Sequence, residues 1–296
     1  MAYQIFIDSS CDMPLSVRKE RNISYFRMGF TLNGEDKYAD MDWVDYTPEI
    51  LYGWIKDPKN VIKTSLLSGK EVIEKCEPLL QKGIDILYLT CTTALSGSKG
   101  VFDLMKEDLL AKYPERRMVS IDSDRSEMSM GLIALHMADL RDEGKSIEEL
   151  KEWFDKEHQH FHQVGSLETL TYLKRQGRVS GAAAFFANMF GVKPVIIQDV
   201  RGMNHIIKKA KGSKSAMDES FEYIKAHVNE RTKEVWIGQA MAQDTQAYLK
   251  KRVEEELHLP VKEFWIGPIV GISCGPGMYG CYFEGDEVTI DSRNEK

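Results

Sequence analysis

Two short segments carry hydroxyl side chains at places where a protein commonly binds an anion. The first reads Cys91-Thr92-Thr93-Ala94-Leu95-Ser96-Gly97-Ser98, and it lies between an apolar run and a helix expected over Ser98–Lys112. Ser96 and Ser98 offer hydroxyls, and Gly97 lets the backbone approach a ligand. The helix start adds unpaired N–H groups and the positive end of the helix dipole. These features predict a carboxylate or phosphate site, with simple helix capping by Ser96 as the alternative interpretation.

Thr64 and Ser65 form the second segment. They end a short extended piece, Val61–Thr64, and precede Ser68, which with Glu71 has the capping-box pattern of a helix start. Taken alone this is an ordinary loop sequence. Ligands of open α/β sheets bind beyond the C-terminal ends of the strands, so both hydroxyl segments are candidates for a site there.

Carboxylates also fall at predicted strand ends, namely Asp8, Asp12, Asp122 and Asp124. Such a group can hold Mg²⁺, and a Mg²⁺-dependent phosphotransferase that uses Asp8, Asp12 and Asp122 is the alternative function. We favour the simpler interpretation that Asp12 and Asp124 cap the helices that follow them.

Three further patterns do not support an active centre. The G-x-S-x-G sequence at 271–275 lacks a following helix and a downstream histidine, both of which a nucleophile elbow needs. Residues 144–146 read Gly-Lys-Ser but lack the earlier glycine of a P-loop. His158, His160 and His162 alternate as on one face of a strand, which we interpret as a polar strand edge rather than a metal site.

Strands and helices alternate along the first half, which predicts a mostly parallel sheet between helix layers. We expect an α/β protein with a three-layer N-terminal domain at 1–160 and a smaller two-layer α/β domain at 161–296. The expected elements that matter most are strands Tyr3–Asp8, Ser24–Leu32, Ile84–Thr90 and Arg117–Asp122, a hairpin at Asn33-Gly34, and helices Ser68–Gly83 with a kink or break at Pro78, Ser126–Glu143, Leu167–Gln176 and Ser180–Phe190. Ser146 and Glu149 give a second capping-box pattern.

The segment Ala182–Phe190 is almost entirely apolar, which is typical of a buried helix. Its small residues would leave room for an alkyl chain between Phe and Met side chains, or they would simply form core.

Composition excludes several other classes of function. The net charge is −7 without a basic stripe, so a nucleic-acid partner is not indicated. No leader pattern is present, and no apolar run approaches the ~20 residues that a membrane span needs. The five cysteines are odd in number and lack a C-x-x-C pair, which favours free thiols and a cytoplasmic location.

An ordered set of segments resembles the DegV family of bacterial fatty acid-binding proteins. The segments are Ile7-Asp8-Ser9-Ser10-Cys11-Asp12-Met13-Pro14, Thr64-Ser65-x-x-Ser68, Leu95-Ser96-Gly97-Ser98, Asp122-Ser123, Leu170-x-Tyr172-Leu173-Lys174-x-x-Gly177-Arg178-Val179-Ser180, Val192-Lys193-Pro194-Val195-Ile196 and Gly267-Pro268-x-x-Gly271-x-x-x-Gly275-Pro276-Gly277. Each is weak alone, but together they occur in the family's order over nearly the whole chain.

The resemblance implies a fatty acid held between two α/β domains, with no cofactor and no catalytic centre of its own. It places the carboxylate near Thr64 and Ser96 and the alkyl tail in the C-terminal domain. The implied ligand-binding residues are Thr64, Ser65, Ser96, Gly97, Ser98, Arg178, Ser273, Cys274 and Gly275. Some members present the bound fatty acid to a separate ATP-dependent kinase subunit, so such a partner is implied; a lipid-responsive interaction protein without a kinase partner is a further alternative.

Three positions depart from the family's pattern. Ser273 stands where a histidine is usual, Lys211 where an arginine is usual, and Leu67 where a proline is usual. Serine cannot act as a cationic donor, and lysine cannot form the bidentate hydrogen bonds of arginine. The departures therefore bear on phosphoryl transfer and on docking to a kinase, whereas Arg178 is retained.

Overall fold

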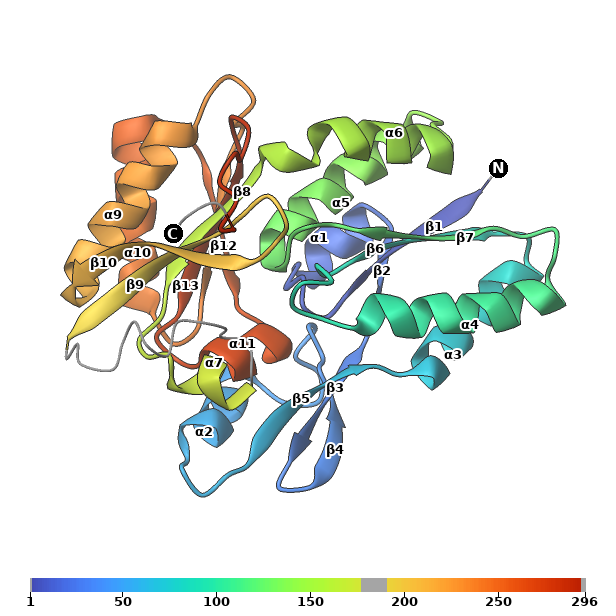
Figure 1. Cartoon of the computed structure of the whole chain (residues 1–296), viewed down its shortest axis with the longest axis horizontal. Coiled ribbons are helices and arrows are strands. Elements are labelled where there is room, and N and C mark those ends of the chain that lie inside the picture. The colour runs from blue at the N-terminus through green and yellow to red at the C-terminus, as the bar shows by residue number, and fades with distance from the viewer. Residues whose placement is uncertain (1, 177–190, 294–296) are drawn as a thin grey trace.

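The computed structural model describes residues 2–176 and 191–293, and their strands form three sheets (Figure 1). The strands are β1 (Tyr3–Asp8), β2 (Ile23–Phe26), β3 (Met28–Leu32), β4 (Glu35–Tyr38), β5 (Ile62–Leu67), β6 (Asp85–Thr90), β7 (Met118–Asp122), β8 (Phe161–Ser166), β9 (Val192–Gln198), β10 (Asn204–Lys211), β11 (Val235–Gln239), β12 (Val261–Trp265) and β13 (Tyr279–Glu284). A parallel sheet has the order β2-β1-β6-β7, a mixed six-stranded sheet has the order β10-β9-β8-β13-β11-β12, and an antiparallel sheet has the order β4-β3-β5.

Helices cover these sheets in layers. They are α1 (Leu15–Glu20), α2 (Pro48–Lys56), α3 (Gly69–Gln81), α4 (Ser98–Lys112), α5 (Glu127–Asp142), α6 (Ile147–Glu157), α7 (Thr171–Gln176), α9 (Gly212–His227), α10 (Gln243–Arg252) and α11 (Pro268–Cys274). Of the helices described, none has both the length and the apolar composition required to cross a lipid bilayer.

The parallel sheet is buried on both faces, which explains the continuous apolar runs of its strands. On β1, Ile5 and Ile7 pack toward α5, whereas Phe6 packs toward α3 and α4 on the opposite face. This alternation follows from the pleat of a strand, in which successive side chains point to opposite faces.

Helix α5 lies between the parallel sheet and the six-stranded sheet (Figure 1). Its residues Met128 and Ile133 share one core with Trp236 and Tyr282 of the six-stranded sheet. The far face of that sheet is covered by α9 and α10. The expected α/β class is confirmed: three layers in the first half are followed by a sheet with one helical layer of its own.

The expected single strand Ser24–Leu32 is wrong. It is divided into β2, which belongs to the parallel sheet, and β3, which belongs to the antiparallel sheet. The break falls at Arg27, whose backbone N–H donates to Glu71 Oε1 at 3.0 Å and so takes no part in a strand ladder. The hairpin at Asn33-Gly34 is confirmed, with both residues at positive φ.

Two helix starts behave largely as the sequence predicts. The Ser68 hydroxyl accepts from Glu71 N at 3.1 Å, but the Glu71 carboxylate binds Arg27, so only half of the expected capping box forms. Ser146 and Glu149 form a complete box at the start of α6. The break expected as one possibility at Pro78 does not occur, because α3 continues to Gln81 and Pro78 lies in its last turn.

Asp12 and Asp124 do not cap helices. The N-cap positions of α1 and α5 are Pro14 and Ser126, and neither makes a side-chain capping bond. Asp12 and Asp124 instead adopt positive φ in the turns before these helices.

Other expectations concern the segments around β8. The predicted histidine-bearing strand is wrong, because residues 158–160 form a 3₁₀ turn and only His162 lies on β8. The predicted helix Leu167–Gln176 begins later, at Thr171. The predicted helix Ser180–Phe190, including Ala182–Phe190, lies outside the described residues.

Candidate ligand-binding site

A cavity lies where the C-terminal ends of β1 and β6 meet β5, α5 and α11, and it encloses about 70 Å³. Its lining consists of Ser10, Met28, Thr64, Ser65, Leu66, Cys91, Leu95, Ser96, Ser126, Glu127, Leu173, Asn204, Ile269, Val270, Ser273 and Cys274. The two hydroxyl segments found in the sequence therefore meet at one place, together with Ser273 and Cys274. Among the described residues that line the cavity, none is Lys, Arg or His.

Thr64 projects from β5 and is half-buried. Its N–H and its hydroxyl both lie near Gln176 Oε1, at 3.3 and 3.5 Å. Gln176 Nε2 in turn donates to the carbonyl oxygen of Ile62 at 2.9 Å. Side-chain hydrogen bonds therefore attach the end of α7 to β5 beside the cavity.

Ser96 and Ser98 form a hydroxyl chain that ties α4 to β5. The Ser96 hydroxyl donates to Ser98 Oγ at 3.1 Å, and Ser98 Oγ also accepts from Leu67 N at 3.2 Å. Ser98 is buried in this joint, whereas Ser96 lines the cavity. The N-cap residue of α4 is Gly97, but the Ser96 hydroxyl accepts from Ser98 N, the first N–H of the helix, at 3.3 Å. The alternative interpretation, capping by Ser96, therefore holds in part.

Ser273 and Cys274 lie on α11, a helix that the sequence analysis did not anticipate. The Ser273 hydroxyl donates to Ile269 O at 2.9 Å, as expected of a serine inside a helix and unlike a nucleophile elbow. Burial raises the pKa of the Cys274 thiol well above its ordinary value, so this thiol stays neutral.

Gly275 positions α7 rather than lining the cavity. It has a φ of 81°, and a Cβ at this position would lie 2.0 Å from Cδ2 of Tyr172. Only glycine therefore lets α7 pack here. The remaining candidate, Arg178, lies outside the described residues.

Glu127 is a cavity residue that sequence reasoning missed. It is the first residue of α5, and its N–H donates to Ser10 O at 3.0 Å. Its carboxylate accepts a hydrogen bond from the Tyr282 hydroxyl, and the Gln163 side chain also binds it. Burial raises the pKa of Glu127 from its ordinary 4.5 to about 7. An acid in the first turn of a helix is common, so its local sequence carried no signal of this burial.

A second, smaller chamber of about 30 Å³ adjoins the first. It is lined by Glu127, Gln163, Gly165, Ser166, Leu167, Leu173, Ile196, Asn204, Cys274, Met278, Tyr279 and Gly280. Glu127, Leu173, Asn204 and Cys274 line both chambers. The first chamber lies at the hydroxyl groups of β5 and of the Ser96 loop, which is the segment 91–97 between β6 and α4. The second chamber lies next to it on the side of the six-stranded sheet.

Asp12 is a second buried acid near this site. Neither carboxylate oxygen has a hydrogen-bond partner of normal geometry among the described residues. Burial raises the pKa of Asp12 well above its ordinary value, and the charge of Glu127 adds to the shift. The backbone N–H of Gly267 offsets the shift only in part. Asp12 therefore favours its neutral form.

The carboxylates proposed for Mg²⁺ in the alternative function do not come together. Asp8 Oδ2 accepts from Tyr88 OH at 2.6 Å and from Cys91 N at 3.2 Å. Asp122 accepts from Thr93 N at 3.1 Å. Asp8, Asp12 and Asp122 do not form a group whose oxygens converge on one point. Their arrangement therefore does not support the phosphotransferase alternative.

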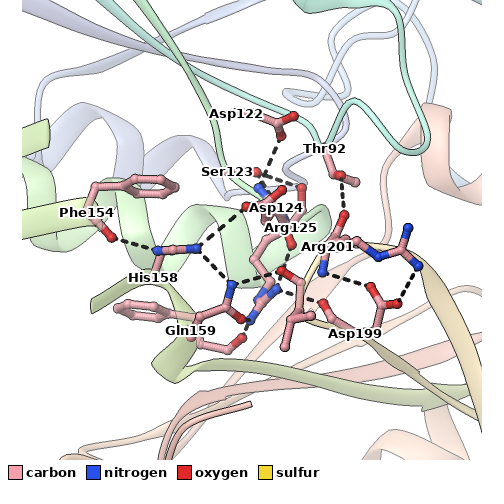
Figure 2. A network of polar contacts seen from close by, with 12 residues as sticks. Thr92, Asp122, Ser123, Asp124, Arg125, Phe154, His158, Gln159, Asp199 and Arg201 are labelled. Carbon is pink, nitrogen blue, oxygen red and sulfur yellow. Dashed lines mark hydrogen bonds and ion pairs between the residues drawn. The ribbon is translucent and has the colours of Figure 1, made fainter. Parts of the chain in front are cut away.

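A polar network beside the site joins the two large sheets through Arg125 (Figure 2). This residue is fully buried, and burial lowers its pKa to about 10, which leaves it protonated at neutral pH. Its guanidinium donates to the carbonyl oxygens of Phe161 at 2.7 Å, Asp199 at 3.1 Å and Asp124 at 2.7 Å, and to Gln159 Oε1 at 2.9 Å. The loop that leads into α5 is thereby fixed against β8 and the end of β9.

Known proteins share this architecture. A DegV domain-containing protein of Clostridium perfringens is 29% identical over 289 residues, which cover 96% of this chain and 98% of the relative. A DegV family protein from Thermus thermophilus, described as binding fatty acid, has a TM-score of 0.84 at 24% identity over 97% of this chain and 100% of that one. The Streptococcus pneumoniae Fatty Acid Kinase (Fak) B3 protein, loaded with linoleic acid, has a TM-score of 0.82 at 20% identity over 97% and 100%.

The structural matches confirm the expected fold over 97% of the chain. A family model described as "Uncharacterised protein, DegV family" matches residues 2–286, a range that includes β5, the Ser96 loop and α11. The resemblance deduced from the ordered sequence segments is thereby confirmed, and the chain belongs to the DegV family.

Proposed function

We propose that this protein binds one long-chain fatty acid, with the carboxylate near Thr64 and Ser96 and the alkyl chain in the two joined chambers. The observation that carries the proposal is that a hydroxyl-bearing cavity shares four lining residues with a second chamber beside the six-stranded sheet. Related proteins from Thermus thermophilus and Streptococcus pneumoniae bind fatty acids, which supports it. In this proposal residues 1–160 supply the head-group loops and residues 161–296 supply the pocket for the tail.

Neutral donors would recognise the carboxylate. The Thr64 hydroxyl can turn from Gln176 Oε1 toward a ligand, and the Ser96 hydroxyl can turn from Ser98 Oγ. Each hydrogen bond to a charged group contributes roughly 1.5–3 kcal/mol. Burying about 14 methylenes at ~0.8 kcal/mol each gives a gross term near 11 kcal/mol. The tail would therefore supply most of the affinity, and the hydroxyls would fix the orientation.

Binding requires the chambers to widen. Their volumes of about 70 and 30 Å³ hold only a few water molecules at roughly 10–15 Å³ each. Leu173 of α7 lines both chambers, and Met28 is a flexible side chain in the wall of the first. We expect these side chains to move when an acyl chain enters, which uses part of the gross binding energy.

The proposed role is that of a carrier rather than an enzyme acting alone. The Cys274 thiol is buried with a raised pKa, and the Ser273 hydroxyl is bound to a backbone carbonyl. The carrier would present the carboxylate of the bound fatty acid to a separate ATP-dependent kinase subunit. Ser273 lacks the positive charge of a histidine, which favours the alternative of a lipid-responsive protein without a kinase partner. Co-precipitation with a kinase subunit from the same genome separates the two.

The first experiment is denaturing extraction of the purified protein followed by mass spectrometry. The proposal predicts about one mole of fatty acid per mole of protein, or stoichiometric uptake when fatty acid is added to a lipid-free sample. Absence of lipid in the extract together with absence of uptake contradicts it. Incubation with ATP and Mg²⁺ alone, without a second subunit, should leave the fatty acid unphosphorylated.

A further inference from the structure

Three potential metal ligands meet at a place remote from the lipid cavity. His162 lies on β8, His227 is the last residue of α9, and Asp286 follows β13. One ligand atom from each lies within 4.8 Å of the others, and this is the one such group among the described residues. We propose that His162, His227 and Asp286 bind a divalent transition-metal ion of the zinc type.

The distances between the ligand atoms fit such an ion. Asp286 Oδ1 lies 3.3 Å from His162 Nε2 and 2.9 Å from His227 Nδ1. Bonds of about 2.0–2.2 Å from zinc to nitrogen and oxygen put neighbouring tetrahedral ligands about 3.3 Å apart. The carbonyl oxygen of Asp286 lies 2.8 Å from the same His162 nitrogen, so an ion can enter only if this oxygen moves aside or becomes a further ligand. Imidazole nitrogens and a carboxylate oxygen are also common ligands of zinc and of other divalent transition metals.

His162 is fixed in place by burial, because its side chain has no exposed surface. A neutral imidazole offers one bare nitrogen, whereas a protonated imidazole offers none.

A change of tautomer would free the coordinating nitrogen. His162 Nε2 lies 2.8 Å from the carbonyl oxygen of Asp286, and Nδ1 lies 3.0 Å from the Tyr223 hydroxyl. With the proton on Nδ1, the ring donates to Tyr223 and Nε2 faces the ion. A tyrosine hydroxyl both accepts and donates, so this exchange needs no movement of Tyr223. A hydrogen bond from the second nitrogen is the usual support of a metal-bound histidine.

Backbone contacts hold the ligands in register. Asp286 N donates to His227 O at 3.1 Å, and Gly285 N donates to His160 O at 2.9 Å. A Cβ on Gly285 would lie 2.3 Å from His227 O, so only glycine allows this approach. The His162 ring stacks on Phe283 with centroids 4.9 Å apart. Pre-positioned ligands lower the ordering cost of binding.

The site is open to solvent on one side. The His227 and Asp286 side chains are 31% and 50% exposed, which leaves room for water as a further ligand. The positive charge of Arg125 acts on His162 and opposes a cation, whereas Asp286 attracts one. None of the three ligands lines either lipid chamber, so this proposal and the fatty acid proposal can fail independently.

The test is titration of the full chain, freed of metal with a chelator, by Zn²⁺ in a calorimeter and by Co²⁺ in a spectrophotometer. His227→Ala and Asp286→Asn are the test variants, because both residues are partly exposed and their replacement should not prevent folding. His258→Ala removes an exposed histidine elsewhere and serves as the matched control. Circular dichroism of each variant without metal confirms that it is folded.

We expect one equivalent of metal bound by the wild type and by His258→Ala, with an increase in melting temperature. Each test variant should bind at least tenfold more weakly, lose the visible Co²⁺ absorption of a low-coordinate site, and show no Zn²⁺-dependent increase in melting temperature. Failure of the wild type to bind either metal overturns the proposal. Equal binding by wild type and both test variants overturns it as well, because the metal would then bind elsewhere.

Discussion

The hydroxyl of Tyr282 on β13 donates a hydrogen bond to the carboxylate of Glu127 at the start of α5. Both residues are buried, and Glu127 lines both lipid chambers. The nearby carboxyl of Asp12 also has a raised pKa and is coupled to Glu127 by charge. A pair of buried acids therefore lies beside the proposed path of the acyl chain, and we expect their titration to affect stability.

The pH dependence of stability should reflect Glu127. Its pKa is raised from 4.5 to about 7 on folding, so the folded state binds more protons than the unfolded state between these values. The free energy of unfolding therefore falls as pH rises through this window, by an amount on the order of 3 kcal/mol. Glu127→Gln should remove this loss, as measured by urea denaturation at pH 5 and pH 8.

Glu107→Gln, on the exposed surface of α4, is the matched control and should keep the wild-type pH dependence. Because Asp12 titrates with Glu127, the apparent midpoint belongs to the pair rather than to one residue. Identical pH dependence in wild type and Glu127→Gln would show that Glu127 is not the titrating group.

Removal of either proposed head-group hydroxyl should weaken fatty acid binding about tenfold without abolishing it. Thr64→Ala and Ser96→Ala each remove one hydrogen bond to the carboxylate, roughly 1.5 kcal/mol, while the buried tail is unchanged. Titration with a fluorescent fatty acid measures the dissociation constants. Ser215→Ala on α9, which lies outside both chambers, should bind as the wild type does. Unchanged affinity in both test variants would place the carboxylate elsewhere.

Arg125 should be among the most sensitive positions for stability. Arg125→Met leaves several buried carbonyl oxygens without a donor, and each such loss costs roughly 1–3 kcal/mol. We expect a loss of at least about 3 kcal/mol in the free energy of unfolding. Arg117→Met breaks only the exposed ion pair with Glu148 and should cost less than about 1 kcal/mol. Similar losses for the two variants would contradict the assigned role of Arg125.

Gly275→Ala should weaken both the fold and ligand binding. A Cβ there would strike the Tyr172 ring and displace α7, which carries Leu173 into both chambers. Gly144→Ala provides the control, because Gly144 also has positive φ but has open space around it. The control should show only the backbone cost of about 1–2 kcal/mol, with normal fatty acid affinity. Melting temperature and fatty acid titration distinguish the two effects, and normal affinity in Gly275→Ala would contradict the link through α7.

Elements with strong local signals could be predicted from the sequence. The helix expected over Ser98–Lys112 has the same bounds in the structure, and Tyr3–Asp8 is a strand as expected. The meeting of Thr64 with Ser96 in one cavity was implied by the resemblance to the DegV family, whereas the expected strand end at Thr64 was wrong, because Thr64 lies within β5. The division of Ser24–Leu32 into two strands could not be predicted, because it depends on Glu71, a residue distant in sequence that binds the backbone of Arg27.

The grouping of the ionisable residues could not be predicted for the same reason. Asp12 precedes a helix and looks like a cap, yet it is buried against Gly267 of a segment near the other end of the chain. His162, His227 and Asp286 come from three elements that are widely separated in sequence. Local patterns report helix and strand preference, whereas these groupings arise from tertiary packing, which local patterns do not encode.

The Gln176 side chain has a consequence for how a ligand would enter and leave. It holds α7 to β5 through side-chain hydrogen bonds with Thr64 N and Ile62 O. Such bonds can break while the helix and the strand stay formed. We therefore expect ligand exchange to take place between β5 and α7, and its rate to depend on these bonds.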